Sequence, residues 1–267
     1  MSEEARIAAM IRWVEEATAT RVDRWRFGSA IYTDDFPGRY DSNFLRIERS
    51  VGAMTSAGLA AEADRLQAHL RHREIVVEDA DEGARLTAGF RDLGWVVDRL
   101  AYMVQRREPA RTPSLLAVRE VGAAALRPAL IATHLAIAGT TQADAEMLAD
   151  FRVVSERLAG TRYFAVEQDG VLAAYCELYL YGGAAQVEDV NTLEMFRNRG
   201  AGRAVVLGAI AAARAAGADL VWLVADAEDW PRHLYAKLGF EQAGGSLQFT
   251  RVPAEHPQMR GEAASAP

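Results

Sequence analysis

The stretch Arg197-Asn198-Arg199-Gly200-Ala201-Gly202-Arg203 combines glycine and arginine in a way that suits an anion. Glycine has no side chain, so backbone amides beside it can approach a ligand closely. An apolar helix is predicted to begin here, and the N-terminus of a helix carries partial positive charge. The stretch therefore favours phosphate binding, although a simple helix start with three solvated arginines fits the same residues.

Three other side chains around this glycine loop could move protons. Glu188 and Asp189 are adjacent carboxylates before the loop, and Tyr235 follows it. A carboxylate can take a proton from a nucleophile, and a phenol can give one to a developing negative charge. Adjacent strand residues face opposite sides, so only one carboxylate can face a cleft unless the strand is bulged. The sequence leaves open which one does so, and it leaves open a different base and a purely packing role for Tyr235.

The elements that must position these residues can be read from periodicity and turn signals. In the second half we predict, in order, a strand at 115–121, helices at 126–138 and 142–158, a hairpin of strands 163–167 and 171–180, a strand at 184–190, a helix at 203–216, a strand at 220–225, a helix at 231–238 and a strand at 247–252. The strand, helix and strand around the glycine loop form a βαβ unit, whose two strands should be parallel.

A dinucleotide-binding fold is the main rival explanation, because Gly200 and Gly202 are followed by Asp226 at the end of the next strand. That fingerprint requires glycine or alanine where Val205 stands. It also requires the glycine turn to follow its strand directly, whereas residues 191–199 form a long connector. These two departures disfavour a nicotinamide enzyme.

The combined motifs resemble the GNAT superfamily of acyl-CoA-dependent N-acyltransferases. The resemblance rests on Arg197-x-x-Gly200-x-Gly202, on the preceding residues 187–192 (VEDVNT) and on the following residues 233–240 (HLYAKLGF), and it covers about 115–252. The first half repeats part of the element order, with a helix at 59–70, a strand at 75–77 and Leu93-Gly94-Trp95. The implied fold class is α/β (α+β): a tandem GNAT fold of two mixed central β-sheets flanked by helices, with the N-terminal copy degenerate.

The resemblance also implies a site for acetyl-CoA along the splayed end of the strand that contains Glu188. Pantetheine would pair with backbone groups near the strand end, and the pyrophosphate would lie on amides of residues 199–203. Tyr235 corresponds to a tyrosine that protonates the departing thiolate, and Glu188 or Asp189 would be the base in direct transfer to an amine. The candidate cofactor-binding residues are Val190, Asn191, Thr192, Arg197, Asn198, Arg199, Gly200, Ala201, Gly202 and Arg203.

Some residues depart from the family pattern. Glu228 stands where many relatives have an asparagine that contacts the cofactor, and Glu194 stands where proline is common. In the first half the nearest match to the glycine motif is residues 49–54, which place Met54 at the second glycine, and no tyrosine follows at the matching position. We therefore predict that the first half binds no CoA.

Composition narrows the remaining possibilities. The 267 residues include 30 Lys and Arg against 37 Asp and Glu, a net charge of −7 that argues against a nucleic-acid partner. The single cysteine, Cys176, excludes an internal disulfide and cysteine-rich zinc sites, and His69 with His72 lacks a completing ligand set, so no metal is expected. No apolar stretch of about 18 residues occurs, so we expect no membrane partner. We expect the protein to be cytoplasmic.

We thus expect a degenerate GNAT-like domain at 1–108, a catalytic domain at 109–253 and a loose tail at 254–267. The expected activity is transfer of the acetyl group of acetyl-CoA to an amine acceptor that the sequence does not identify, by a monomer or homodimer. The alternative is a non-catalytic protein that binds acyl-CoA as a sensor or interaction module.

Overall fold

The computed structural model describes residues 1–109, 116–137, 139–228 and 231–253. The chain forms two compact units: unit 1 contains residues 1–18, 101–133 and 149–244, and unit 2 contains 19–100, 134–148 and 245 onwards. Strands β5 (Val96–Gln105) and β11 (Phe240–Arg251) and helix α5 (Gln142–Ala159) contribute residues to both units. The domains expected from the sequence are continuous stretches of the chain, whereas each of these units is built from three separate segments. The expected tail at 254–267 and residues 110–114 of the connector lie outside the described residues.

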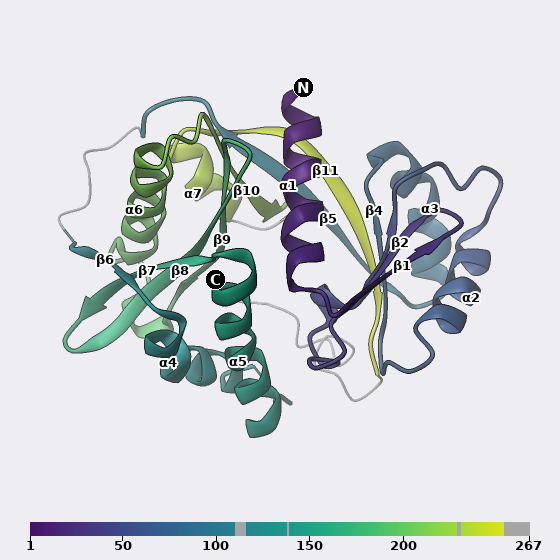
Figure 1. Cartoon of the computed structure of the whole chain (residues 1–267), viewed down its shortest axis with the longest axis horizontal. Coiled ribbons are helices and arrows are strands. Elements are labelled where there is room, and N and C mark those ends of the chain that lie inside the picture. Colours follow the sequence, from purple (N-terminus) through teal and green to yellow (C-terminus); the bar gives the residue numbers. More distant parts are fainter. Residues whose placement is uncertain (110–115, 138, 229–230, 254–267) are drawn as a thin grey trace. The chain divides into compact units, whose positions relative to one another are not determined.

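The strands of unit 1 lie in the order β6-β7-β8-β9-β10-β5 (Figure 1). The new elements are β6 (Val118–Val121), β7 (Arg162–Gln168), β8 (Val171–Tyr181), β9 (Ala184–Thr192) and β10 (Leu220–Asp226). Neighbours from β6 to β9 are antiparallel, while β9 and β10 are parallel. The predicted βαβ unit is therefore confirmed. Asp169 and Gly170 both have positive φ, as the tight turn of the predicted hairpin requires.

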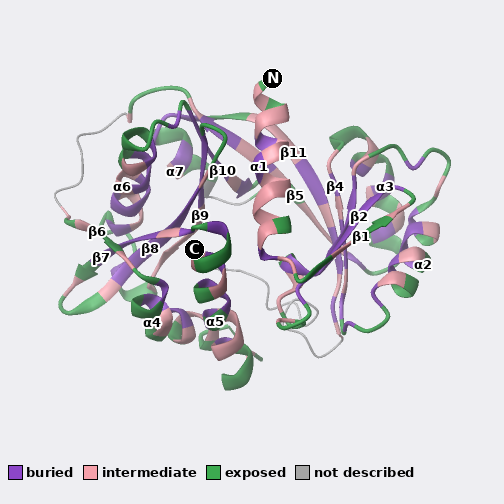
Figure 2. Cartoon of the chain, viewed as in Figure 1, coloured by how far each residue is buried: buried purple, intermediate pink, exposed green. Residues whose placement is uncertain are grey.

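Helices cover both faces of this sheet because side chains alternate along the strands. Tyr163 and Ala165 pack with α4 (Ala123–Leu135), whereas Phe164 and Val166 pack with α6 (Ala201–Ala215). Helix α1 (Glu3–Thr18) packs its apolar residues against Trp222 of β10. Helix α7 (Pro231–Lys237) precedes β11. The centre of β8 and the first four residues of β9 and of β10 are accordingly buried (Figure 2).

Unit 2 repeats part of this arrangement. Its strands lie in the order β1 (Arg21–Trp25), β2 (Gly28–Tyr32), β3 (Phe44–Ile47), β4 (Arg73–Val77) and the second part of β11, with helices η1 (Tyr40–Ser42), α2 (Ser56–Leu66) and α3 (Ala80–Asp92). Strands β3 and β4 are parallel and are joined through α2, as β9 and β10 are joined through α6. Leu59 and Phe90 of the helices pack on Ile75 and Phe249 of the sheet. The repeated order agrees with the predicted duplication.

The structure adds one strand to the predicted elements and corrects two element boundaries. Strand β1 was not predicted, and β2 pairs with it along its full length. Helix α2 begins at Ser56, not Leu59, because the Thr55 side chain accepts a hydrogen bond from the Gly58 amide. Strand β11 begins at Phe240, not Leu247. Its first part contains two glycines and the charged Glu241, so pairing within the sheet decides its conformation against weak local propensity.

Gly239 offers a test of how closely the backbone packs before β11. It has φ +90°, its carbonyl accepts from the amides of Arg106 and Arg107, and a Cβ atom there would lie 1.9 Å from the Arg107 carbonyl oxygen. We expect Gly239→Ala to lower the free energy of unfolding by about 3 kcal/mol. Gly170→Ala is the matched control, because its φ is +75° but its Cβ would meet open space. Denaturant unfolding followed by tryptophan fluorescence compares them; equal losses would contradict the expected close approach.

Candidate active site

Strands β9 and β10 are paired only over their first parts. The parallel ladder runs from Ala184 and Leu220 to Val187 and Leu223, yet β9 continues to Thr192 and β10 to Asp226. On its other side β9 stays paired with β8 as far as Thr192. The backbone of residues 188–192 therefore has no ladder partner on the β10 side. This is the splayed strand end that the sequence resemblance implied.

A β-bulge in β9 accompanies this divergence. Glu188 lies opposite Glu177 of β8 and Asn191 lies opposite Tyr175, so Asp189 and Val190 share one position of the partner strand. Asp189 adopts φ +45°. A bulge bends its strand and redirects the side chain that it carries. The strict alternation that would send Glu188 and Asp189 to opposite faces is thus broken here.

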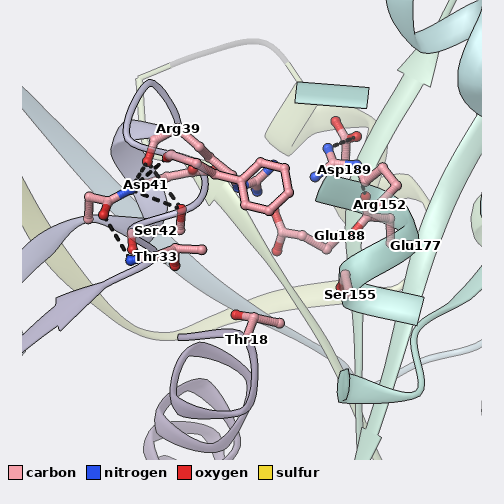
Figure 3. A network of polar contacts seen from close by, with 12 residues as sticks. Thr18, Thr33, Arg39, Asp41, Ser42, Arg152, Ser155, Glu177, Glu188 and Asp189 are labelled. Carbon is pink, nitrogen blue, oxygen red and sulfur yellow. Dashed lines mark hydrogen bonds and ion pairs between the residues drawn. The ribbon is translucent and has the colours of Figure 1, made fainter. Parts of the chain in front are cut away.

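A cluster of carboxylates surrounds Arg152 of α5 (Figure 3). The guanidinium group forms ion pairs of 2.6 Å with Glu177 and with Asp189. Arg152 and Glu177 are buried, whereas Asp189 is partly exposed. The Tyr179 hydroxyl also donates to Glu177, at 2.6 Å. Burial of an ion pair is tolerated only with such further polar contacts, so this cluster holds the bulged strand end against α5.

Glu188 has a different environment from its two acidic neighbours. Its carboxylate accepts a 2.6 Å hydrogen bond from the Gln186 side chain, and no ion pair to it occurs among the described residues. Burial, and then the negative charges of Glu177 and Asp189, raise the pKa of Glu188 to about 7. A carboxyl group with this pKa is half ionised at neutral pH. It is therefore suited to accept a proton there.

The glycine loop presents the N-terminus of α6. Gly200, with φ +84°, is the N-cap residue, and no side chain caps the helix there. The first intrahelical hydrogen bond is made by the Ala204 amide, so the amides of residues 201–203 point out of the helix end. Gly202 lies so close to Thr192 that a Cβ atom would be 2.7 Å from the threonine Oγ1. The loop therefore holds the strand end and the helix N-terminus together.

The other predicted loop residues lie around this helix end. Arg197 and Arg199 are exposed, and Asn198 is exposed with φ +61°. The Arg197 Nε donates to the Thr192 carbonyl at 3.5 Å, and the Arg199 guanidinium lies 5.7 Å from the Phe196 ring centre. Ala201 is buried, and Arg203 is partly exposed on α6. Two exposed guanidinium groups thus flank the amides of the helix start.

Tyr235 belongs to α7 and has 7% of its surface exposed. Its ring packs edge-on against Phe240, with 6.2 Å between ring centres. This contact accounts for the packing role that the sequence left open for Tyr235. It also joins α7 to the first residue of β11. The proton-donor role of Tyr235 stays a prediction.

Unit 2 lacks both features at its equivalent strands. The ladder of β3 and β4 ends at Ile47 and Val77, which are the last residues of the two strands, and the Glu78 amide donates to Ile47 beyond it. The start of α2 is capped by Thr55. Neither an unpaired strand edge nor an uncapped helix start is therefore offered for CoA. The absence of CoA binding by the first half stays a prediction.

Sequence analysis missed Arg152 and Glu177. Both gave a usable signal: Glu177 is the one charged residue in the apolar strand 171–181, and Arg152 lies on the helix face that carries Ala145, Ala149 and Ser155. A charged side chain on a face that must be buried requires a partner of opposite charge. Cys176 lies in the same apolar strand. It is fully buried, and burial raises the pKa of its thiol, so it is suited to packing and not to nucleophilic attack.

Two further expectations from the sequence were that the protein holds no metal and that it has no membrane-spanning segment. Within the described residues, no three His, Cys, Asp or Glu side chains are grouped so that they could hold a metal ion. Of the helices in the described part of the chain, none combines the length and the hydropathy needed to cross a membrane.

Comparison with known proteins agrees with this geometry. A family profile, "Acetyltransferase (GNAT) family", matches residues 131–240. Residues 131–240 are a GNAT acetyltransferase domain. No curated protein sequence matches the chain. The match to this family model over residues 131–240 supports an acyltransferase activity.

Solved structures with the same fold match a larger part of the chain than the family profile does. A GCN5-related N-acetyltransferase from Kribbella flavida has a TM-score of 0.61 at 17% identity, over 95% of this chain and 97% of its own. A functionally unknown conserved protein from Staphylococcus epidermidis has 0.67 at 16% identity, over 87% and 94%. A tandem GNAT protein from the clavulanic acid biosynthesis pathway has 0.52 at 16%, over 77% and 74%. At these identities the similarity establishes the fold, which is the predicted tandem GNAT fold.

The raised pKa of Glu188 can be tested directly. Carbon NMR of labelled glutamate should show one carboxyl group that titrates near pH 7 and that is absent from Glu188→Gln. In Glu177→Gln this midpoint should fall towards the ordinary range, because one nearby negative charge is removed while burial remains. Glu194→Gln, an exposed change on η2 (Glu194–Phe196), should leave it unchanged. A Glu188 midpoint below 5 in the native protein would show that burial does not perturb this group.

Proposed function

We propose that the GNAT domain transfers the acetyl group of acetyl-CoA directly to an amine. The observation that carries this proposal is the end of the β9–β10 ladder immediately before Glu188. Beyond this point β9 has an unpaired strand edge. The same unit contains the uncapped start of α6 and the Glu188 carboxyl group, whose pKa is about 7. These are the requirements for binding an acyl-CoA and for deprotonating an amine.

The residues present suit the co-substrate. Backbone groups of Val190, Asn191 and Thr192 have no partner strand on the β10 side and can pair with the pantetheine amides. The amides of residues 199–203, with Arg197 and Asn198 beside them, suit the pyrophosphate. The close approach of Gly202 to Thr192 leaves no room for a side chain, which explains the glycine.

Acetyl-CoA, when bound, supplies an activated thioester. In the proposed mechanism Glu188 takes a proton from the ammonium form of the acceptor, and the resulting amine can attack the thioester carbonyl. Tyr235 donates its hydroxyl proton to the sulfur as the carbon–sulfur bond breaks. The attacking nitrogen loses its second proton as the amide forms, and a proton returns to the Tyr235 phenolate through water. The structure favours Glu188 over Asp189 as the base, because Asp189 is engaged with Arg152. Asp189 then acts by holding the bulge.

The co-substrate site is tested by calorimetric titration with acetyl-CoA, CoA and NADPH. We expect saturable binding of acetyl-CoA and CoA, and loss of both in Gly202→Glu, which fills the helix start with a side chain and a negative charge. Val153→Glu adds the same charge at an exposed position of α5 and should bind normally. Binding of NADPH alone would contradict the proposal.

The catalytic roles are tested by thiol release from acetyl-CoA with lysine, spermidine and a short peptide as acceptors. Because Glu188 must be ionised, kcat/KM should rise between pH 6 and 8 with an apparent pKa near 7. Glu188→Gln should lower kcat/KM about 10²-fold and remove this dependence.

Tyr235→Phe separates a catalyst from a protein that only binds acyl-CoA. It should lower kcat about 10²-fold while the dissociation constant of acetyl-CoA stays within about twofold, because the phenol acts only as the thiolate leaves. Native binding of acetyl-CoA with no thiol release from any acceptor would favour the non-catalytic alternative.

A further inference from the structure

Unit 2 contains a cavity of about 1020 Å³ that the proposed acetyl transfer does not use. All its lining residues belong to this unit. Its volume is at the upper end of the range for small-molecule sites. The floor is formed by side chains of adjacent strands, namely Glu74 of β4, Gln248 and Thr250 of β11 and Asp98 of β5.

The walls come from two separate segments of unit 2. Residues 37–41 provide one wall, with the ring of Tyr40 stacked on His72 at 4.0 Å between ring centres. Residues 139–148, which include the start of α5, provide the other together with Ile137. Gly38 is packed so closely on Met147 that a Cβ atom would lie 2.8 Å from the methionine Cε. Apolar groups of Leu70, Ile137, Met147 and Leu148 complete the lining.

Glu74 is the unusual member of this floor. Its side chain has only 2% of its surface exposed, on a face of β4 opposite the apolar core. Gln248 and Thr250 of β11 lie beside its carboxyl group, and among the described residues no cation forms an ion pair with it. By contrast, the nearby Asp41 accepts a 3.0 Å hydrogen bond from Arg39 (Figure 3). A buried carboxyl group without a cation must be neutralised by a proton or by a ligand.

We propose that this cavity binds an organic cation, namely a primary amine with an apolar body, whose ammonium group pairs with the Glu74 carboxylate. Apart from Glu74, the lining contains three carboxylates and one arginine, and this excess of acidic groups favours a cation. The aromatic and aliphatic walls suit the apolar body. This inference does not rest on acetyl transfer. The charged and titratable groups that face the cavity besides Glu74 are Asp41, His69, Arg71, Asp98 and Asp144.

Binding should be coupled to a proton. Burial, and then the charges of Asp41 and Asp98, raise the pKa of Glu74 to about 8, so in the ligand-free protein at pH 7 the group holds its proton. An ammonium group requires the ionised form and therefore displaces that proton. Affinity should rise about tenfold between pH 6 and 7, and by about fivefold between pH 7 and 8, where the carboxyl group becomes half ionised without ligand. Burial lowers the pKa of His72 to about 4, so His72 stays neutral over this range.

The test uses the full chain without acetyl-CoA and calorimetry with 2-phenylethylamine, with 2-phenylethanol as the uncharged match. At pH 7 the amine should bind with release of close to one proton, measured from the heats in two buffers of different ionisation enthalpy. Glu74→Gln, which keeps the shape of the protonated side chain, should weaken amine binding at least tenfold and abolish proton release.

Matched variants assign the effect to Glu74. Asp92→Asn removes an exposed carboxylate of the same unit, and His69→Gln removes the histidine that lines the cavity. Both should retain amine binding and proton release. Glu188→Gln should also retain them, which separates this site from the transferase site. Failure of the native chain to bind the amine, equal binding of the alcohol, or undiminished binding by a folded Glu74→Gln protein would overturn the proposal.

Discussion

The ion pairs of Arg152 with Glu177 and Asp189 are the contacts on which the active-site end of unit 1 depends. Three carboxylates converge there with one guanidinium group, so the cluster carries excess negative charge. Two of the acids are compensated directly, and the third, Glu188, instead has its pKa raised to about 7. One buried arginine thus both anchors the bulged strand and leaves a carboxyl group able to exchange a proton near neutrality.

The bulge at Asp189 links this electrostatic arrangement to the backbone. The extra residue in β9 ends the regular register with β8, and the parallel ladder with β10 stops two residues earlier, at Val187. The strand edge beyond that point lacks a partner, and the N-terminus of α6 lies close to its end through the contact of Gly202 with Thr192. Unit 2 has the same strand, helix and strand, but its ladder is complete and its helix is capped. The difference between the two units lies in these few backbone groups.

Each unit nevertheless contains a glutamate whose pKa is raised above its ordinary value. Glu188 titrates beside two charged acids at the strand divergence, while Glu74 lies in the floor of a separate cavity. Both are polar side chains on strands whose other face packs on helices. The degenerate unit has therefore kept the architecture but places its acid in a pocket with a different chemistry.

Much of this protein could be predicted from local sequence. The glycine loop, the hairpin at Asp169 and Gly170, the βαβ unit and the repeated order of the first half all follow from turn chemistry and periodicity, which depend on residues close in the chain. The positions of Glu188, Asp189 and Tyr235 were recognised from the same motifs. Strand β1 and the first part of β11 were not, because their strand conformation comes from pairing with distant segments.

Only the tertiary structure could distinguish the two adjacent acids. The alternation rule left Glu188 and Asp189 equivalent, and it failed because a bulge, which has no local signature in this sequence, changes which side chain meets Arg152. The pKa of a carboxyl group depends on burial and on charges brought together from α5, β8 and β9, and none of these distances is encoded by spacing along the chain. The sequence by itself determined the type of fold and the residues able to do chemistry, while long-range packing decided which of them has the environment to do it.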